Sequence, residues 1–157
     1  MTLETLPSAP RLIDGPDEAP ATVLITHGAG APMDSPFMGA IAGELVQRGW
    51  RVVRFEFPYM VRMRETGRRH GPDRMPLLQE TFRDQVRLER ATWPERPLFI
   101  GGKSMGGRVA SLLIDKLDDL IDPSHIKELE ASFGEVVRRP RPFAWCKSRG
   151  PNALIRG

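Results

Sequence analysis

The residues of this chain that are best suited to chemistry surround Ser104. The run Gly102-Lys103-Ser104-Met105-Gly106 has the spacing G-x-S-x-G, between a short apolar run and a stretch of helical periodicity. A serine on a sharp turn from a strand into a helix has an unfavourable backbone conformation, and its neighbours two positions away must be small. Both neighbours are glycine. The pattern favours a nucleophilic serine exposed on a turn, and a plain glycine-rich turn is the alternative.

The tripeptide Gly102-Lys103-Ser104 is also found in phosphate-binding loops. Such a loop has the pattern G-x-x-x-x-G-K-[ST], so a glycine must stand five positions before Gly102. Pro97 stands there, which rejects a Walker-type loop. For acyl transfer, the N–H of Met105 and the helix dipole behind it would stabilise a developing oxyanion.

A second glycine-rich segment, His27-Gly28-Ala29-Gly30, follows an earlier apolar run. A loop after a parallel strand can present a backbone N–H at the same sheet edge as Ser104, and acyl transfer needs a second such donor. We expect Gly28 or Ala29 to be this donor. We expect His27 to brace the loop, because a general base needs correct aim as well as proximity.

The same segment has a competing interpretation as a dinucleotide-binding fingerprint. Gly28 and Gly30 have the spacing G-x-G, and Glu56 stands where a ribose-binding acid would lie. However, Met33 replaces the third glycine, and two prolines would fall in the first turns of a helix that began at Gly30. We rank this interpretation below acyl transfer.

Two histidines are candidates for the general base. His70 lies in a long basic loop that opens at the same sheet edge as Ser104, although an exposed loop histidine is the favoured alternative. His125 follows several aspartates, but a helix from Met105 to Leu117 would carry the chain roughly 20 Å away from Ser104. We therefore expect His125 to be a solvated residue at a helix start.

Three strand-helix units must position these residues. Apolar strands are expected at 21–26, 50–57 and 98–101, and amphipathic helices at 35–49, 77–92 and 105–117, with a basic loop at 58–76. This alternation predicts an α/β fold with a parallel sheet. Residues 11–13 are the only possible edge strand in the proline-rich start, a further helix is expected near 122–134, and no strand is expected after it.

The chain divides into a flexible segment at 1–20, a core at 21–134 and a basic irregular tail at 135–157. The net charge is +3, but residues 137–157 hold six basic and no acidic residues, so the rest of the chain is mildly acidic. Arginines alternate with Phe143 and Trp145 in the tail, a composition that can bind RNA. We favour an irregular end without that function, so a nucleic-acid partner is not expected.

Composition narrows the class of protein further. The hydrophobic content is 40%, no apolar run reaches the roughly 20 residues of a membrane helix, and no signal-peptide pattern opens the chain. The single Cys146 cannot form an internal disulfide. We expect a cytoplasmic protein with one core and no membrane partner.

The segments LITHGAGAPMDSPFM, RFEFPYM and FIGGKSMGGRVAS resemble the α/β-hydrolase superfamily. The resemblance covers about residues 21–113. It is greatest to small dienelactone-hydrolase-like proteins, nearest the hydrolase-like domain of a chromatin NSL-complex subunit and a testis-expressed relative. It implies a three-layer core and hydrolysis of a small-molecule ester or related acyl substrate without a cofactor. Ser104 would be the nucleophile, and Met105 with Gly28 or Ala29 would form the oxyanion hole.

The sequence also departs from that family. A triad acid and histidine should follow on later strands, yet only 53 residues follow Ser104 and none form a β-rich run. We therefore expect a sheet incomplete at its C-terminal edge and an incomplete triad. An exposed edge would favour self-association. An inactive scaffold is the alternative function, and a NAD-type domain is the third.

One basic segment favours a particular substrate. It is the loop expected at 58–76, whose arginines would overhang the site and attract an anionic substrate: Arg62, Arg64, Arg68, Arg69 and Arg74. A solvated charged loop is the alternative interpretation.

Overall fold

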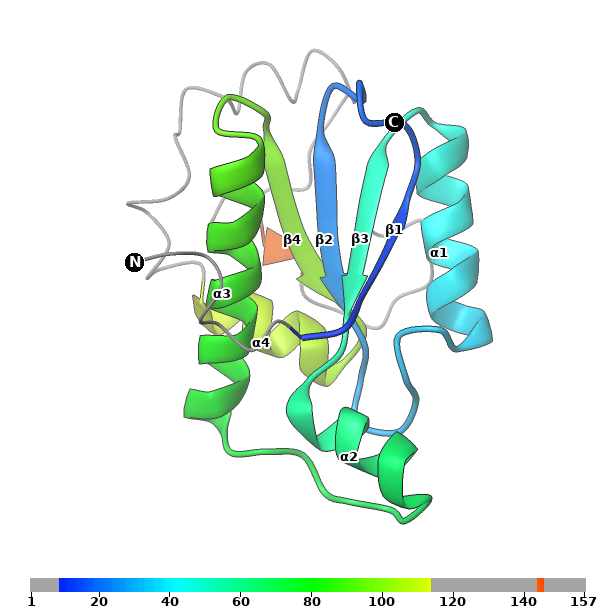
Figure 1. Cartoon of the computed structure of the whole chain (residues 1–157), viewed down its shortest axis with the longest axis vertical. Coiled ribbons are helices and arrows are strands. Elements are labelled where there is room, and N and C mark those ends of the chain that lie inside the picture. The colour runs from blue at the N-terminus through cyan, green and yellow to red at the C-terminus, as the bar shows by residue number, and fades with distance from the viewer. Residues whose placement is uncertain (1–8, 114–143, 146–157) are drawn as a thin grey trace.

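The computed structural model describes residues 9–113 and 144–145 of the chain (Figure 1). Its sheet has the order β1-β3-β2-β4-β5. The strands are β1 (Arg11–Asp14), β2 (Thr22–Thr26), β3 (Arg51–Phe55), β4 (Leu98–Gly102) and β5 (Ala144–Trp145). β2 pairs in parallel with β3 and β4, β1 is antiparallel to β3, and β5 is parallel to β4.

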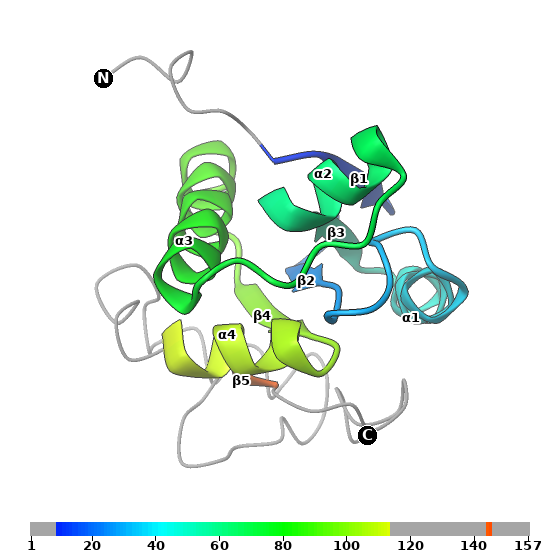
Figure 2. The same ribbon diagram turned by 90° about the horizontal axis from the view of Figure 1, so that it is seen from below.

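The helices are α1 (Pro36–Gln47), α2 (Pro58–Thr66), α3 (Met75–Thr92) and α4 (Met105–Leu113). Seen along the strands, α1 lies on one face of the sheet and α3 on the other (Figure 2). α4 packs against α3 and β4. The predicted three-layer α/β core with a short, mainly parallel sheet is therefore confirmed.

The core forms where the central strands meet the helices. All five residues of β2 are buried, as expected for a strand covered on both faces. Across one face, the rings of Phe55 and Phe82 meet edge to face with centroids 4.9 Å apart, which joins β3 to α3. Burying a phenylalanine side chain stabilises a fold by about 1.5–3 kcal/mol, so this contact fixes α3 on the sheet.

Local sequence signals explain α1. The Oγ of Ser35 accepts a hydrogen bond from the Met38 N–H at 3.4 Å, and Pro36 occupies the first helical position, where no N–H is needed. Ile41 and Leu45 are buried on its inner face, as the apolar spacing predicted. The helix start therefore comes directly after the glycine-rich loop and fixes where that loop ends.

Two predictions about the elements were wrong, those for α2 and β5, and one was confirmed. α2 lies inside the segment expected to be a loop, because Pro58 favours a helix start and Gly67 ends the helix in a left-handed conformation, with φ +66°. The possible edge strand at 11–13 is confirmed as β1, which extends to Asp14 and pairs with β3. β5 stands in the tail expected to hold no strand, since two residues are too few to show periodicity.

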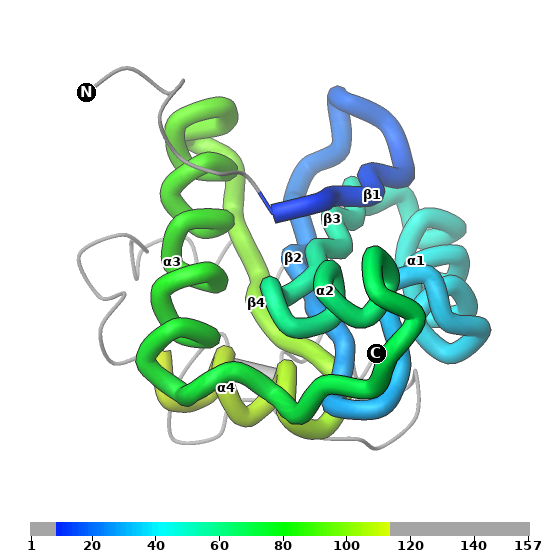
Figure 3. The backbone as a smooth tube through the Cα atoms, turned by 60° about the horizontal axis from the view of Figure 1, so that its bottom comes forward, coloured from blue at the N-terminus to red at the C-terminus, as the bar shows by residue number. Residues whose placement is uncertain are grey.

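The loops that carry the candidate chemistry meet at one end of the sheet. Figure 3 shows that the loop after β2, helix α2 and the segment between α2 and α3 gather where β2, β3 and β4 end. Carboxyl ends of parallel strands are the usual place for a site in an α/β fold. In the described part of the chain, no helix combines the length and apolar composition that a membrane span requires.

Candidate active site

Ser104 occupies a strained turn between β4 and α4. Its φ is +50°, and it is the only residue other than glycine with a positive φ within the described part of the chain. Its side chain is exposed. A left-handed backbone at a non-glycine residue costs free energy and persists only where the surrounding structure imposes it. The turn therefore leaves the side chain of Ser104 exposed at the end of the sheet.

The glycines on either side of Ser104 are required by close packing. A Cβ at Gly102 would lie 2.7 Å from the carbonyl carbon of Gly106 and 2.7 Å from the Thr26 oxygen. A Cβ at Gly106 would lie 2.5 Å from the oxygen of His27. Neither position has room for a side chain, so the turn is held against the end of β2.

The loop after β2 approaches Ser104 directly. A Cβ at Gly28 would lie 3.6 Å from the Cβ of Ser104 and 3.2 Å from the oxygen of Lys103. Among the hydrogen bonds of the described residues, none has the N–H of Ala29 or of Met105 as its donor. Two unpaired backbone donors thus belong to the segments that meet at Ser104.

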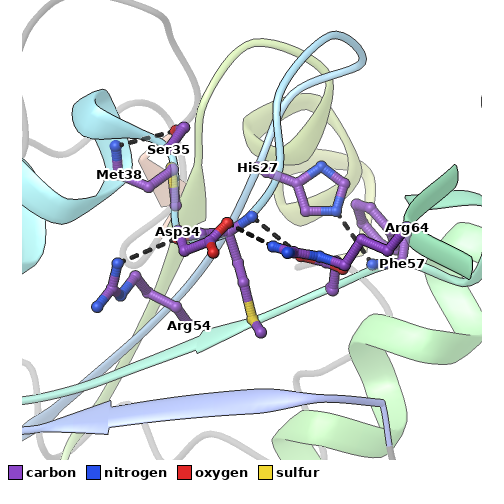
Figure 4. Close-up of polar contacts among 9 residues, drawn as sticks. His27, Asp34, Ser35, Met38, Arg54, Phe57 and Arg64 are labelled. Atoms are coloured by element: carbon purple, nitrogen blue, oxygen red, sulfur yellow. Dashed lines mark hydrogen bonds and ion pairs between the residues drawn. The ribbon is translucent and has the colours of Figure 1, made fainter. Parts of the chain in front are cut away.

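His27 is a buried brace for this loop, as predicted. Its Nε2 accepts a hydrogen bond from the Phe57 N–H at 3.1 Å (Figure 4), so the ring proton resides on Nδ1 and is donated to the Gly28 oxygen at 2.7 Å. Burial lowers the pKa of His27, which favours this neutral form. Both ring nitrogens are occupied by backbone groups, which leaves neither free for proton transfer.

Tyr59, which sequence reasoning missed, contacts the same loop. Its hydroxyl donates to the Gly28 oxygen at 2.9 Å, and its backbone N–H donates to Oδ2 of Asp73 at 2.8 Å. The ring is fully buried and lies edge-on to His27, with centroids 5.7 Å apart. The only available signal was a tyrosine directly after Pro58 at a helix start, because the contact to Gly28 spans 31 positions.

Glu56 fixes the far end of the loop. This buried carboxylate accepts from Nε of Arg64 at 2.6 Å and from the Met33 N–H at 3.2 Å. Arg64 also pairs with Asp34, which lowers the pKa of that carboxyl (Figure 4). Glu56 is therefore committed to internal partners and is not free to bind a ribose, and the helix that would open a dinucleotide site begins only at Pro36.

The basic segment differs from the expected overhanging loop. Arg64 is paired as described above, and Arg62 is paired with Asp73. These two cations are neutralised by carboxylates, since α2 places them beside acidic side chains. The remaining arginines of the segment have exposed side chains: Arg68, Arg69 and Arg74.

His70, the candidate base that the structure describes, makes no hydrogen bond to the serine. Nε2 of His70 lies 3.1 Å from Oγ1 of Thr66 at the end of α2, and no hydrogen bond joins the Ser104 hydroxyl to any described residue. His125 lies outside the described residues, as do the helix expected near 122–134 and Cys146. In residues 9–113, no group of histidine, cysteine or carboxylate side chains could hold a metal ion.

The fold is similar to that of several solved hydrolases. An α/β serine hydrolase without a lid from Xanthomonas campestris is 25% identical, with a TM-score of 0.55 over 69% of this chain and 50% of that one. A dienelactone hydrolase from Anabaena variabilis is 20% identical, with a TM-score of 0.62 over 71% and 53%. A serine hydrolase homologue from Coxiella burnetii is 23% identical, with a TM-score of 0.54 over 68% and 51%.

The chain spans about half the length of these solved structures. No curated protein sequence matches it. A family model described as an α/β hydrolase domain matches residues 19–131, which include β2 to α4 and the turn at Ser104. On that match, the chain belongs to the α/β-hydrolase family.

Proposed function

We propose that this chain is a serine hydrolase in which Ser104 attacks the carbonyl carbon of a carboxylic ester or related acyl bond. The observation that carries the proposal is the positive φ of Ser104 on an exposed turn at the carboxyl end of β4. Strain of this kind is found where function requires it. The spacing of the two glycines and the strand-turn-helix context also support a nucleophile at this position.

The proposed reaction proceeds through an acyl-enzyme. The Oγ of Ser104 bonds to the carbonyl carbon while its proton passes to a base, and the carbonyl oxygen becomes an oxyanion. The unpaired N–H groups of Met105 and Ala29 would donate to this oxyanion, and the dipole of α4 adds favourable charge. The base returns the proton to the leaving oxygen, which departs as the alcohol, and a water that gives its proton to the same base then hydrolyses the acyl-enzyme and frees Ser104.

The proposal also includes a candidate base, His70, and a class of substrate. His70 is the one described histidine whose ring is not already held by two backbone groups. We also keep the predicted incomplete triad, since no described histidine bonds to Ser104. A small-molecule acyl substrate without a cofactor remains our expectation, as does the narrower resemblance to the NSL-complex and testis-expressed group.

The alternative is an inactive scaffold of the same fold that binds a partner or ligand. The specific observation in its favour is that the Ser104 hydroxyl has no hydrogen-bonded base among residues 9–113. Self-association through the edge of the sheet would fit such a role.

A fluorophosphonate probe separates these functions, because it reacts with an activated serine and leaves an inactive one unmodified. We expect labelling at Ser104 that is lost in Ser104→Ala and is slower than in hydrolases with a complete triad. Labelling at the full rate would contradict the incomplete triad. Complete absence of labelling would contradict the hydrolase and favour the scaffold.

His70→Gln and His125→Gln identify the base in the same assay. His70→Gln should slow labelling if His70 accepts the Ser104 proton, whereas the rate of His125→Gln should equal that of the wild type. A loss confined to His125→Gln would overturn the choice of His70.

A further inference from the structure

Two hydrogen bonds converge on one backbone oxygen beside Ser104. The carbonyl of Gly28 accepts from the Tyr59 hydroxyl at 2.9 Å and from Nδ1 of His27 at 2.7 Å. A carbonyl oxygen has two lone pairs, so both acceptor sites are occupied. The direction of this carbonyl is therefore fixed toward the buried side of the loop, where Tyr59 and His27 lie.

The direction of the carbonyl determines where the next N–H points. No cis peptide bond occurs in the described residues, and in a trans peptide the C=O and the following N–H point in opposite directions. The Ala29 N–H must then point away from Tyr59, on the exposed side of the loop. Ala29 is exposed and Gly28 packs beside Ser104, so we infer that this N–H lies on the side of the loop that adjoins the serine.

We propose that Tyr59 is a positioning residue of the oxyanion hole, which aims the Ala29 N–H by holding the Gly28 carbonyl. The inference rests on the proposed function of Ser104. Tyr59 would touch neither substrate nor reacting atoms, so it acts only through the peptide between Gly28 and Ala29.

Tyr59 differs from His27 in where it is anchored. His27 is the chain neighbour of Gly28 and its ring is held by the Phe57 N–H, whereas Tyr59 belongs to α2. The backbone N–H of Tyr59 lies in the first helical turn and has no acceptor within the helix. It donates instead to Asp73, which is also paired with Arg62. The Tyr59 ring also stacks on Phe57, with centroids 6.4 Å apart. Tyr59 therefore supplies a reference point outside the loop.

The surroundings of Tyr59 keep its hydroxyl a donor. Burial is the main cause that raises the pKa of the phenol, and the nearby charges of Asp73 and Glu56 raise it further. The raised pKa keeps the phenol protonated at neutral pH, so its O–H remains a hydrogen-bond donor there.

Tyr59→Phe tests the proposal, because it removes one hydroxyl and keeps the ring. The matched control is Ile41→Val, a buried change on α1. Both should destabilise the fold by similar small amounts. We expect Tyr59→Phe to slow fluorophosphonate labelling of Ser104 about tenfold relative to the control, less than the 10²–10³-fold cost of deleting an oxyanion donor.

A second measurement reports the orientation of the peptide bond between Gly28 and Ala29. The residual dipolar coupling of the Ala29 N–H reports the direction of that bond, and we expect it to change in Tyr59→Phe and not in Ile41→Val. If the wild type is not labelled at all, the proposed function fails, and this coupling still decides the role of Tyr59. An unchanged coupling, or equal labelling rates in the two variants, would overturn the proposal.

Asp73→Ala provides an independent test if Tyr59→Phe does not fold. It removes the acceptor that fixes the first turn of α2 while leaving the Tyr59 hydroxyl in place. We expect about a threefold slower labelling of Ser104 and a changed Ala29 coupling, because the anchor of Tyr59 is loosened. Wild-type values for both would overturn the proposal.

Discussion

Two buried glutamates mark the two ends of β3 and bind arginine in different settings. Glu89 of α3 pairs with Arg51, the first residue of β3, at 2.5 Å, and with Arg11 of β1. Glu56 follows the last residue of β3 and pairs with Arg64 of α2 at 2.6 Å. Glu89 thus joins strands to a helix, whereas Glu56 joins a helix to the loop beside Ser104.

The exposure of the arginines separates the two sites further. The side chains around Glu89 are mostly buried, with Arg51 only 6% exposed, while Arg64 is 41% exposed. An arginine that loses its carboxylate can be hydrated only where water reaches it. The same ion-pair chemistry should therefore support global stability at Glu89 and the geometry of the candidate active site at Glu56.

The largest expected effect is that of Glu89→Gln. It leaves two mostly buried guanidinium groups without a carboxylate, and breaking a buried ion pair costs about 3–5 kcal/mol. Urea unfolding should show a loss of this size in the free energy of unfolding. Labelling of Ser104 per folded molecule should stay at the wild-type rate. A loss below about 1 kcal/mol would show that the Glu89 site contributes little.

Glu56→Gln should affect stability less than Glu89→Gln does, and it should slow the labelling of Ser104. The loss of stability should be about 1–3 kcal/mol, because Arg64 can be hydrated and only the buried hydrogen bonds are weakened. Labelling of Ser104 should slow, since the Met33 N–H loses a charged acceptor and the loop is less firmly held. If Glu56→Gln and Glu89→Gln give the same labelling rate per folded molecule, the two ends of β3 do not differ as proposed.

The turn at Ser104 and helix α1 could be predicted because local chemistry specifies them. A left-handed serine needs glycine on both sides, and a capped helix needs Ser35 followed by Pro36. Helix α2 carried similar signals in Pro58 and Gly67, but its basic composition concealed them. Pro58 and Gly67 specify the ends of this helix more strongly than the charges between them oppose it.

Other features of the site depend on contacts that sequence spacing does not encode. The bond from Tyr59 to Gly28 and the commitment of Glu56 to Arg64 arise only once α2 is folded against the loop. The pairing of Arg62 with Asp73 and of Arg64 with Glu56 was not predicted for this reason, because the segment was expected to be an open loop. Strand β5 has only two residues, so its sequence shows no alternation of apolar and polar residues that could predict a strand.

The stability of the end of β3 near the candidate active site should also depend on pH, through His27. Its folded pKa is lowered by burial, so the unfolded chain binds more protons as pH falls below about 6.5. Stability should be fully present above that pH and should fall by at most about 1.4 kcal/mol per pH unit below it. His27→Asn should abolish this slope in urea unfolding at pH 7.5 and 5.5. A slope unchanged by that substitution would contradict the assignment.

An exposed ion pair should show the smallest loss of stability when its carboxylate is removed. Glu44 and Arg48 are one turn apart on α1, with 3.6 Å between their charged atoms and side chains 35% and 44% exposed. Water hydrates both groups in the folded and unfolded chain, so Glu44→Gln should cost only about 0.3–0.5 kcal/mol. Urea unfolding at low and at 1 M salt checks this, because screening should remove the difference from wild type. A cost approaching that of Glu56→Gln would mean that burial is not what separates these carboxylates, and the contrast between the ends of β3 would need another cause.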